Sequence, residues 1–240
     1  MIRVLVWNEY IHEKDPNNAS STVYPHGIHN AIADFLGKEE DIEVTTATLD
    51  DENCGITDEV LKNTDVIIWW GHCGHDRVPD GVAEKVHEAV LNGMGAVFLH
   101  SAHKSKPFMR LMGTSCSLIW RESGDTERVW VSKPSHPIAA GIETCFELEA
   151  DETYGEPFGI PNPDDIVFMG WYSGGEVFRS GVTFTRDNGR IFYFQPGHET
   201  FPTFYDPNVQ RVILNAVRWA KPDVRTENVM DCPNPPSRNK

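Results

Sequence analysis

The chain has 240 residues, of which 40% are hydrophobic and 10% aromatic, so it can build a packed core and is not disordered throughout. Its 36 acidic and 21 basic residues give a formal net charge of −15, which disfavours nucleic acids and anionic membranes as partners. Apolar runs reach only about six residues, whereas a membrane-spanning helix needs about 20.

The N-terminus and the cysteines bear on the cellular compartment. A strand-like segment begins at the first residues, with no basic region or apolar signal segment before it, so we expect a cytoplasmic protein. The five cysteines are odd in number and widely spaced, and no CxxC motif is present. This pattern favours neither a disulfide framework nor a thiolate zinc site.

The first half of the chain alternates strand and helix patterns. Short apolar runs rich in branched residues predict buried strands at residues 2–7, 42–48, 66–70 and 95–100. Between and after them, apolar spacings of three and four predict helices at residues 28–36 and 82–93, and a short helix is expected at 107–113. Thr57 can cap another short helix with Asp58 and Glu59 in its first turn, and a long loop runs from the first strand to about Pro25. This alternation predicts an α/β fold with a parallel sheet covered on both faces.

The pattern changes after about Thr114. Short runs separated by glycine, proline and acidic turns predict antiparallel strands at residues 127–131, 166–171, 182–185 and 191–194, the last of which could rejoin the main sheet. Residues 208–220 have the apolar stripe of a final helix. We therefore expect one domain over residues 1–222, followed by a polar, proline-rich tail over residues 223–240 that lies on the surface or reaches a neighbouring subunit.

Most of the ten histidines follow predicted strands or begin a predicted helix. In an open parallel sheet, ligands bind beyond the carboxyl ends of the strands, so these side chains are expected to lie near one another. Any one of them taken alone is as well explained by a structural hydrogen bond. Together with a carboxylate, several imidazoles suit acid–base chemistry or a divalent ion such as zinc. The histidines in question are His26, His29, His72, His75, His100, His103 and His198.

An acidic stretch, ELEADETYGEP, adds further candidates. In an extended segment Glu152 and Tyr154 point to the same side, which would place a carboxylate beside a phenol. Trp171 or Tyr172 could stack on a sugar, but packing in the core or at its rim is the commoner role and the sequence gives sugar stacking no special support. The sequence has neither a GxGxxG motif after the first strand nor a P-loop, so no nucleotide cofactor is indicated.

The chain resembles the ThuA-like (trehalose utilisation) family, a branch of the class I glutamine amidotransferase-like proteins. The matching segments span roughly residues 1–221 and are IRVLVWNEYIHEK, YPHGIHNAIA, WWGHCGH, FLHSAHKSKPF, RLMGT, DETYGEPF, GGEVFRSG and YFQPGHETFPTFYDPNVQRVILNAVRWA. The resemblance implies a flavodoxin-like, three-layer sandwich. It also implies a role in the metabolism of trehalose or a related disaccharide, including 3-keto sugars made by a partner sugar 3-dehydrogenase.

The same resemblance argues against glutamine hydrolysis. Amidotransferases of this fold carry a nucleophilic cysteine on the sharp turn after a central strand, where this chain has His100. His198 matches their partner histidine, but Glu199 is adjacent to it and position 200 is threonine, so the catalytic triad is not preserved.

These observations lead to one site hypothesis with two rivals. We expect His72, His100, Glu152 and Tyr154 to be catalytic, and His29, His103 and His198 to hold a divalent metal, zinc or manganese, next to a small sugar. A homo-oligomer is expected from the tail and the decorated sheet. The rivals are a non-catalytic sugar-binding or regulatory module, and a glycosidase that uses Glu152 with Glu156.

Overall fold

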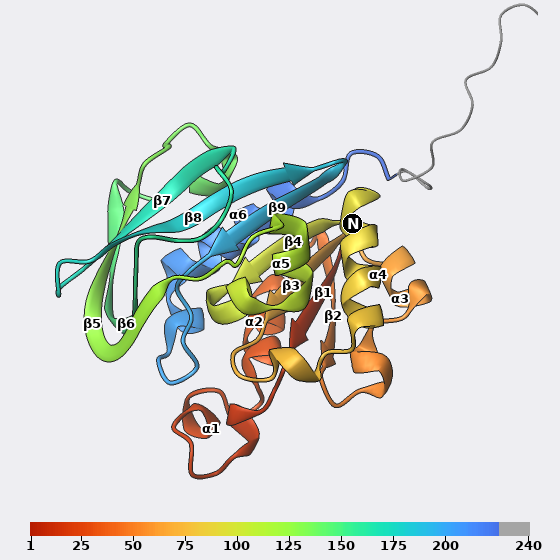
Figure 1. Cartoon of the computed structure of the whole chain (residues 1–240), viewed down its shortest axis with the longest axis horizontal. Coiled ribbons are helices and arrows are strands. Elements are labelled where there is room, and N and C mark those ends of the chain that lie inside the picture. The colour runs from red at the N-terminus through yellow and green to blue at the C-terminus, as the bar shows by residue number, and fades with distance from the viewer. Residues whose placement is uncertain (226–240) are drawn as a thin grey trace, which may run out of the picture.

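The computed structural model describes residues 1–225, which form a nine-stranded sheet in the order β2-β1-β3-β4-β9-β8-β7-β5-β6 (Figure 1). The first five strands in this order are parallel, and the remaining pairs are antiparallel. The strands are β1 Ile2–Asn8, β2 Ile42–Thr48, β3 Val66–Trp70, β4 Gly95–Leu99, β5 Ile119–Val131, β6 Cys145–Gly155, β7 Asp165–Tyr172, β8 Val177–Arg186 and β9 Gly189–Phe194. The expected flavodoxin-like architecture, which is also that of class I glutamine amidotransferases, is confirmed.

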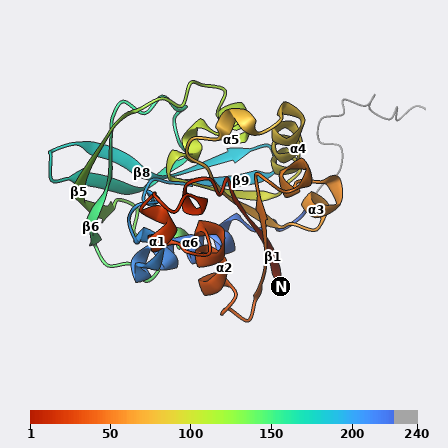
Figure 2. The same ribbon diagram turned by 90° about the horizontal axis from the view of Figure 1, so that it is seen from below.

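Helices cover both faces of the parallel half (Figure 2). On one face α2 and α6 pack on Val4 and Val6 of β1, and on the other α3, α4 and α5 pack with Leu5 and Trp7. Alternate residues of β1 therefore pack into two different cores, and this explains why successive residues of the strand are apolar. The helices are α1 Ser20–Val23, α2 Ile28–Leu36, α3 Asp58–Lys62, α4 Asp80–Leu91, α5 Lys106–Met112 and α6 Pro207–Ala220.

The antiparallel half extends the sheet beyond β9. The predicted segment 191–194 does rejoin the main sheet, because β9 pairs in parallel with β4 and in antiparallel fashion with β8. The chain turns between β7 and β8 at Gly175, which has a φ of +100°. The strand predicted at residues 127–131 is the end of the longer β5, which pairs with β6 and β7.

The segment after β1 is more ordered than a plain loop. It contains a 3₁₀ turn at His12–Lys14 and the short helix α1, and the Tyr24 hydroxyl at its end donates a hydrogen bond to the Phe201 carbonyl over 2.6 Å. The segment is therefore tied to the loop after β9.

Helix α6 begins at a side-chain cap. The Asp206 carboxylate accepts hydrogen bonds from the backbone N–H groups of Asn208 and Val209, over 2.8 and 3.1 Å. We expect Asp206→Ala to lower the free energy of unfolding by about 1 kcal/mol, because two N–H groups lose their partner. Urea denaturation measures this, with Asp34→Ala on the exposed side of α2 as the control. Equal effects of the two substitutions would contradict the role of the cap.

Most of the predicted tail, from residue 226 onward, lies outside the described residues. Within residues 1–225 no helix has the length and apolar character needed to cross a membrane.

Candidate functional site

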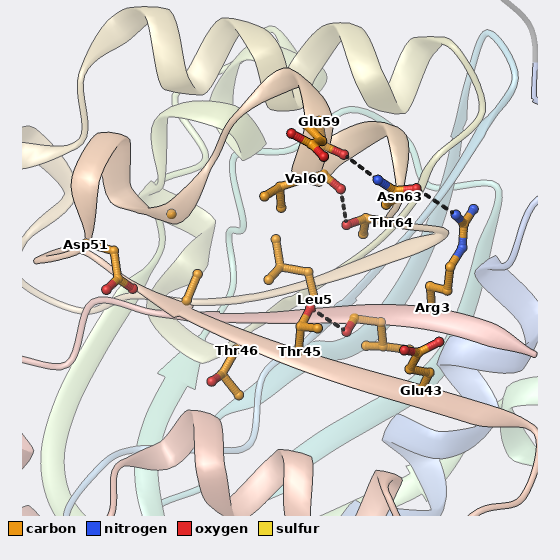
Figure 3. Close-up of a pocket in the computed structure, with 13 residues that line it drawn as sticks. Arg3, Leu5, Glu43, Thr45, Thr46, Asp51, Glu59, Val60, Asn63 and Thr64 are labelled. Atoms are coloured by element: carbon orange, nitrogen blue, oxygen red, sulfur yellow. Dashed lines mark hydrogen bonds between the residues drawn. The ribbon is translucent and has the colours of Figure 1, made fainter.

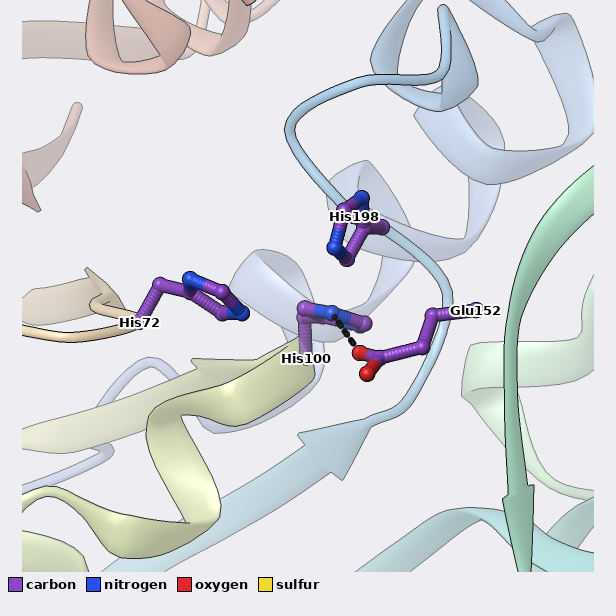
Figure 4. Close-up of side chains that lie close together, drawn as sticks. All are labelled: His72, His100, Glu152 and His198. Atoms are coloured by element: carbon purple, nitrogen blue, oxygen red, sulfur yellow. Dashed lines mark ion pairs between the residues drawn. The ribbon is translucent and has the colours of Figure 1, made fainter. Parts of the chain in front are cut away.

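Four side chains converge at the carboxyl edge of the parallel strands. They are His72 after β3, His100 after β4, Glu152 of β6 and His198 after β9, and each offers a ligand atom within 4.8 Å of the others (Figure 4). His100, Glu152 and His198 are buried, and His72 is partly exposed. Three of the four follow strands of the parallel half and Glu152 comes from the antiparallel half, so the site needs both halves.

His100 occupies a strained turn directly after β4. Its φ is +53°, a left-handed conformation that non-glycine residues rarely adopt. The Tyr193 hydroxyl donates a hydrogen bond to the His100 carbonyl over 2.9 Å. His100 Nδ1 lies 2.9 Å from the Gln195 carbonyl, which can only accept, so Nδ1 carries a proton and Nε2 faces the site.

His100 and Glu152 form a buried pair. His100 Nε2 lies 2.9 Å from Glu152 Oε2, although neither atom forms a well-directed hydrogen bond. Burial acts to lower the pKa of His100, but the Glu152 contact outweighs burial and raises that pKa. Burial likewise acts to raise the pKa of Glu152, but His100 outweighs it and lowers that pKa. Both directions favour the charged pair.

Asp151, next to Glu152, fixes the loop that carries His198. Its fully buried carboxylate accepts hydrogen bonds from the backbone N–H groups of Gly197 and His198, over 3.0 and 3.2 Å. Gly197 has a φ of +135°, and a Cβ there would lie 2.5 Å from the Phe204 ring, so only glycine fits. Asp151 therefore sets the position of His198 relative to β6.

The hydrogen bonds of His198 define its tautomer. The Thr200 N–H points at His198 Nδ1 over 3.3 Å, and the Thr200 hydroxyl lies 2.8 Å from the same atom. Because a backbone N–H can only donate, Nδ1 accepts, and Nε2 carries the proton when the ring is neutral. Burial, followed by the positive charge of His100, lowers the pKa of His198 to about 4.

Glu199 connects the site to a histidine that the sequence analysis did not place in it. His12 Nδ1 lies 2.7 Å from Glu199 Oε1, and this contact raises the pKa of His12. Burial acts to raise the pKa of Glu199, but the His12 hydrogen bond and the nearby histidines outweigh it and lower the pKa to about 2. His72 Nδ1 lies 3.6 Å from the same carboxylate. The adjacency of Glu199 to His198 was the available signal for its role.

Glu9 holds the loop after β3 that carries His72. Its carboxylate accepts hydrogen bonds from the backbone N–H groups of Cys73 and Gly74, over 2.9 and 2.8 Å. Residues 1–225 contain a second group with metal-ligand geometry, formed by His12, His72 and Cys73, which shares His72 with the first.

The unsatisfied atoms of the four-residue group fit a cation. His198 Nε2 is buried without a hydrogen-bond partner, and the buried His100 Nε2 and Glu152 Oε2 contact each other over 2.9 Å without a well-directed hydrogen bond. Such atoms cost free energy unless something binds them. Three imidazoles and one carboxylate form a donor set that zinc or manganese accepts, provided that the ion displaces the proton of His100 Nε2 and that His198 shifts its proton to Nδ1.

The other predicted site residues take up positions around this group. Tyr154 stacks on His100, with ring centroids 5.0 Å apart. His103 lies outside the four-residue group, its Nδ1 donating to the Cys116 carbonyl over 2.6 Å, and burial lowers its pKa to about 3. His29 also lies outside the group, and its Nδ1 lies 3.0 Å from the Asn8 amide.

A cavity of about 300 Å³ opens beside the group. His72, His103, Glu152 and Tyr154 line it. A larger cavity of about 630 Å³ lies elsewhere, between β2 and α3 (Figure 3). There the Arg3 guanidinium donates hydrogen bonds to Asp65 and Asn63. The main cationic group of that cavity is therefore already paired, whereas His198 Nε2 at the histidine edge has no hydrogen-bond partner.

Two further candidates do not suit the roles considered for them. The Glu156 carboxylate accepts hydrogen bonds from the Arg179 guanidinium over 2.7 and 2.9 Å, which makes it a poor partner for Glu152 in glycoside hydrolysis. Tyr172 is fully buried, so it cannot stack on a sugar.

Solved structures with this fold include a ThuA-like protein from Parabacteroides merdae, with 17% identity, a TM-score of 0.65 and coverage of 95% of this chain and 93% of that chain. A cytoplasmic protein from Salmonella typhimurium is 14% identical, with a TM-score of 0.63 and coverage of 92% and 100%. PurLQS from Thermotoga maritima is 14% identical, with a TM-score of 0.57 and coverage of 91% and 98%. These likenesses show that the chain has the same fold, an α/β sheet of the glutamine amidotransferase-like type.

The family is defined by the sequence itself. The family profile described as ThuA, trehalose utilisation, matches residues 3–220. The chain therefore belongs to the ThuA trehalose utilisation family, as the resemblance implied. A search of curated proteins finds no significant match.

Proposed function

We propose that this protein is an enzyme of carbohydrate metabolism that acts on a sugar or a 3-keto sugar at the group formed by His72, His100, Glu152 and His198. The observation that carries the proposal is the convergence of these four side chains from four separate strands, with unsatisfied buried atoms facing one another. Such an arrangement costs stability and is typical of a functional site.

The group is proposed to hold a divalent cation, zinc or manganese. When bound, such an ion supplies Lewis acidity toward a sugar carbonyl or a water molecule. The chain's own residues prepare the site: the Gln195 carbonyl fixes the orientation of the His100 ring, and Asp151 fixes the loop of His198. Tyr154 stacks on the His100 ring and lines the cavity beside the group.

Family membership supports the substrate class. Trehalose utilisation calls for chemistry on a disaccharide, and a 3-keto sugar supplied by a sugar 3-dehydrogenase would bring a carbonyl for the site to polarise. The Salmonella protein is described as cytoplasmic, and we propose the same compartment here. A homo-oligomer is part of the same proposal.

Metal analysis tests the proposal directly. We expect purified, untagged protein to contain close to one zinc or manganese per chain after mild dialysis, and Glu152→Gln to lower the affinity for that ion at least about tenfold. His87→Ala is the control, because His87 lies on α4 near Glu84 and away from the group. Equal metal content in the wild type and Glu152→Gln would contradict the assignment of these ligands.

A second candidate uses the same residues without a metal. The hydrogen bond from the Thr200 N–H leaves the proton of neutral His198 on Nε2, which favours His198 as a hydrogen-bond donor to a sugar oxygen. The Glu152 carboxylate, which His100 keeps in its charged form, would then accept a proton from the carbon next to a 3-keto group. Metal-free wild type that converts a 3-keto sugar, and keeps its rate in the presence of a chelator, would support this mechanism over the first.

A further inference from the structure

The mouth of the site cavity carries an exposed tryptophan. Trp120 is 63% exposed and lines the cavity of about 300 Å³ together with Glu152 and Tyr154. Trp120 is the most exposed of the tryptophans among residues 1–225, and most of a tryptophan's surface is usually buried in a folded protein. An aromatic face at the rim of a polar cavity is typical of a ligand-binding surface.

The register of β5 and β6 places Trp120 next to the catalytic group. Trp120 lies directly opposite Tyr154 in the antiparallel pair, so their side chains are on the same face of the ribbon. Cβ atoms of directly opposed residues are about 4.5–5.5 Å apart. Since Tyr154 stacks on His100, Trp120 lies one cross-strand step outward from the proposed reaction centre.

Polar groups flank the tryptophan. Glu122, two residues farther along β5, lines the cavity, and so does Lys104. The Lys104 ammonium donates one hydrogen bond to the Ser115 carbonyl over 2.9 Å, and an ammonium has three donors. An apolar ring face flanked by a carboxylate and an ammonium matches a sugar ring, which has an apolar C–H face and hydroxyl groups around its edge.

We propose that Trp120, with Glu122 and Lys104, forms a subsite for a second sugar ring, so that the site prefers a disaccharide or other glycoside over a free monosaccharide. This inference rests on the proposed function. The reacting ring lies at His100 and Glu152, and the neighbouring ring stacks on Trp120.

Matched substitutions on one strand test the subsite. We expect Trp120→Ala to raise the Kd for trehalose, or the KM for 3-keto-trehalose, about tenfold, while the values for glucose and 3-keto-glucose stay unchanged. Trp120→Phe is expected to restore most of the affinity because it keeps an aromatic face. Trp130→Ala is the control, since Trp130 is also on β5, is 41% exposed and packs against Arg128 instead of lining the cavity.

Each of the other possible outcomes would count against the subsite. Equal binding of trehalose by the wild type and Trp120→Ala would overturn the subsite and leave the proposed function standing. An equal loss for monosaccharides and disaccharides, or a change in oligomeric state on size-exclusion chromatography, would also overturn it, the latter by assigning Trp120 to a subunit contact. Wild type that neither binds nor converts any of these sugars would count against both the proposed function and the subsite.

Discussion

Replacing His100 by asparagine is expected to lower kcat for the conversion of a 3-keto sugar about a thousandfold. His100 is fully buried, contacts Glu152 over 2.9 Å and stacks on Tyr154, so it is central to either proposed mechanism. General acid–base groups contribute about 10²- to 10⁴-fold to catalysis. Steady-state kinetics on 3-keto-trehalose provide the measurement.

The choice of asparagine separates chemistry from folding. Asparagine tolerates the left-handed conformation better than most residues, so the φ of +53° at position 100 need not change. His26→Asn, at an exposed position before α2, is the matched control and should keep the wild-type rate. An unchanged kcat for His100→Asn in folded protein would rule His100 out of the mechanism.

Replacing Gly95 by alanine is expected to lower the free energy of unfolding by about 3 kcal/mol or more. A Cβ at Gly95, the first residue of β4, would lie 2.3 Å from the Ala220 carbonyl oxygen at the end of α6. The clash is with backbone, so no side-chain rotation can relieve it. Either β4 or the end of α6 has to move.

Gly81→Ala is the matched control for this prediction. A Cβ at Gly81, in the first turn of α4, meets nothing within 4 Å. Alanine is the better helix former, so this substitution should raise the free energy of unfolding by up to about 1 kcal/mol. Guanidinium denaturation of both variants gives the comparison. Equal midpoints would show that the contact between β4 and α6 is looser than the distance implies.

The parallel half of the fold was predictable because its strands are apolar on both faces. All five residues of β3 and of β4 are buried, and such runs are distinctive in sequence. The first part of β5 was not predictable for the opposite reason. Residues 119–124 are exposed and show no apolar alternation, so this part of the strand depends on its pairing with β6. Long-range pairing of that kind leaves no local signal.

The sequence predicted where the candidate site lies, but it did not predict which side chains form it. The strand ends placed His72, His100 and His198 at one edge, and the structure brings them together with Glu152. Spacing alone could not tell that His103 Nδ1 turns to the Cys116 carbonyl. That choice depends on the path of a loop, as does the contact of His12 with Glu199, which crosses most of the chain.

The place of β9 in the sheet has a consequence for synthesis of the protein. This strand is made near the end of the chain, yet it lies between β4 and β8 in the middle of the sheet. A nascent chain that stops before Gly189 therefore exposes two unpaired strand edges, each able to pair with another chain. These edges close only after residues 189–194 have been made, so termination before them should yield aggregation-prone fragments rather than a smaller folded protein.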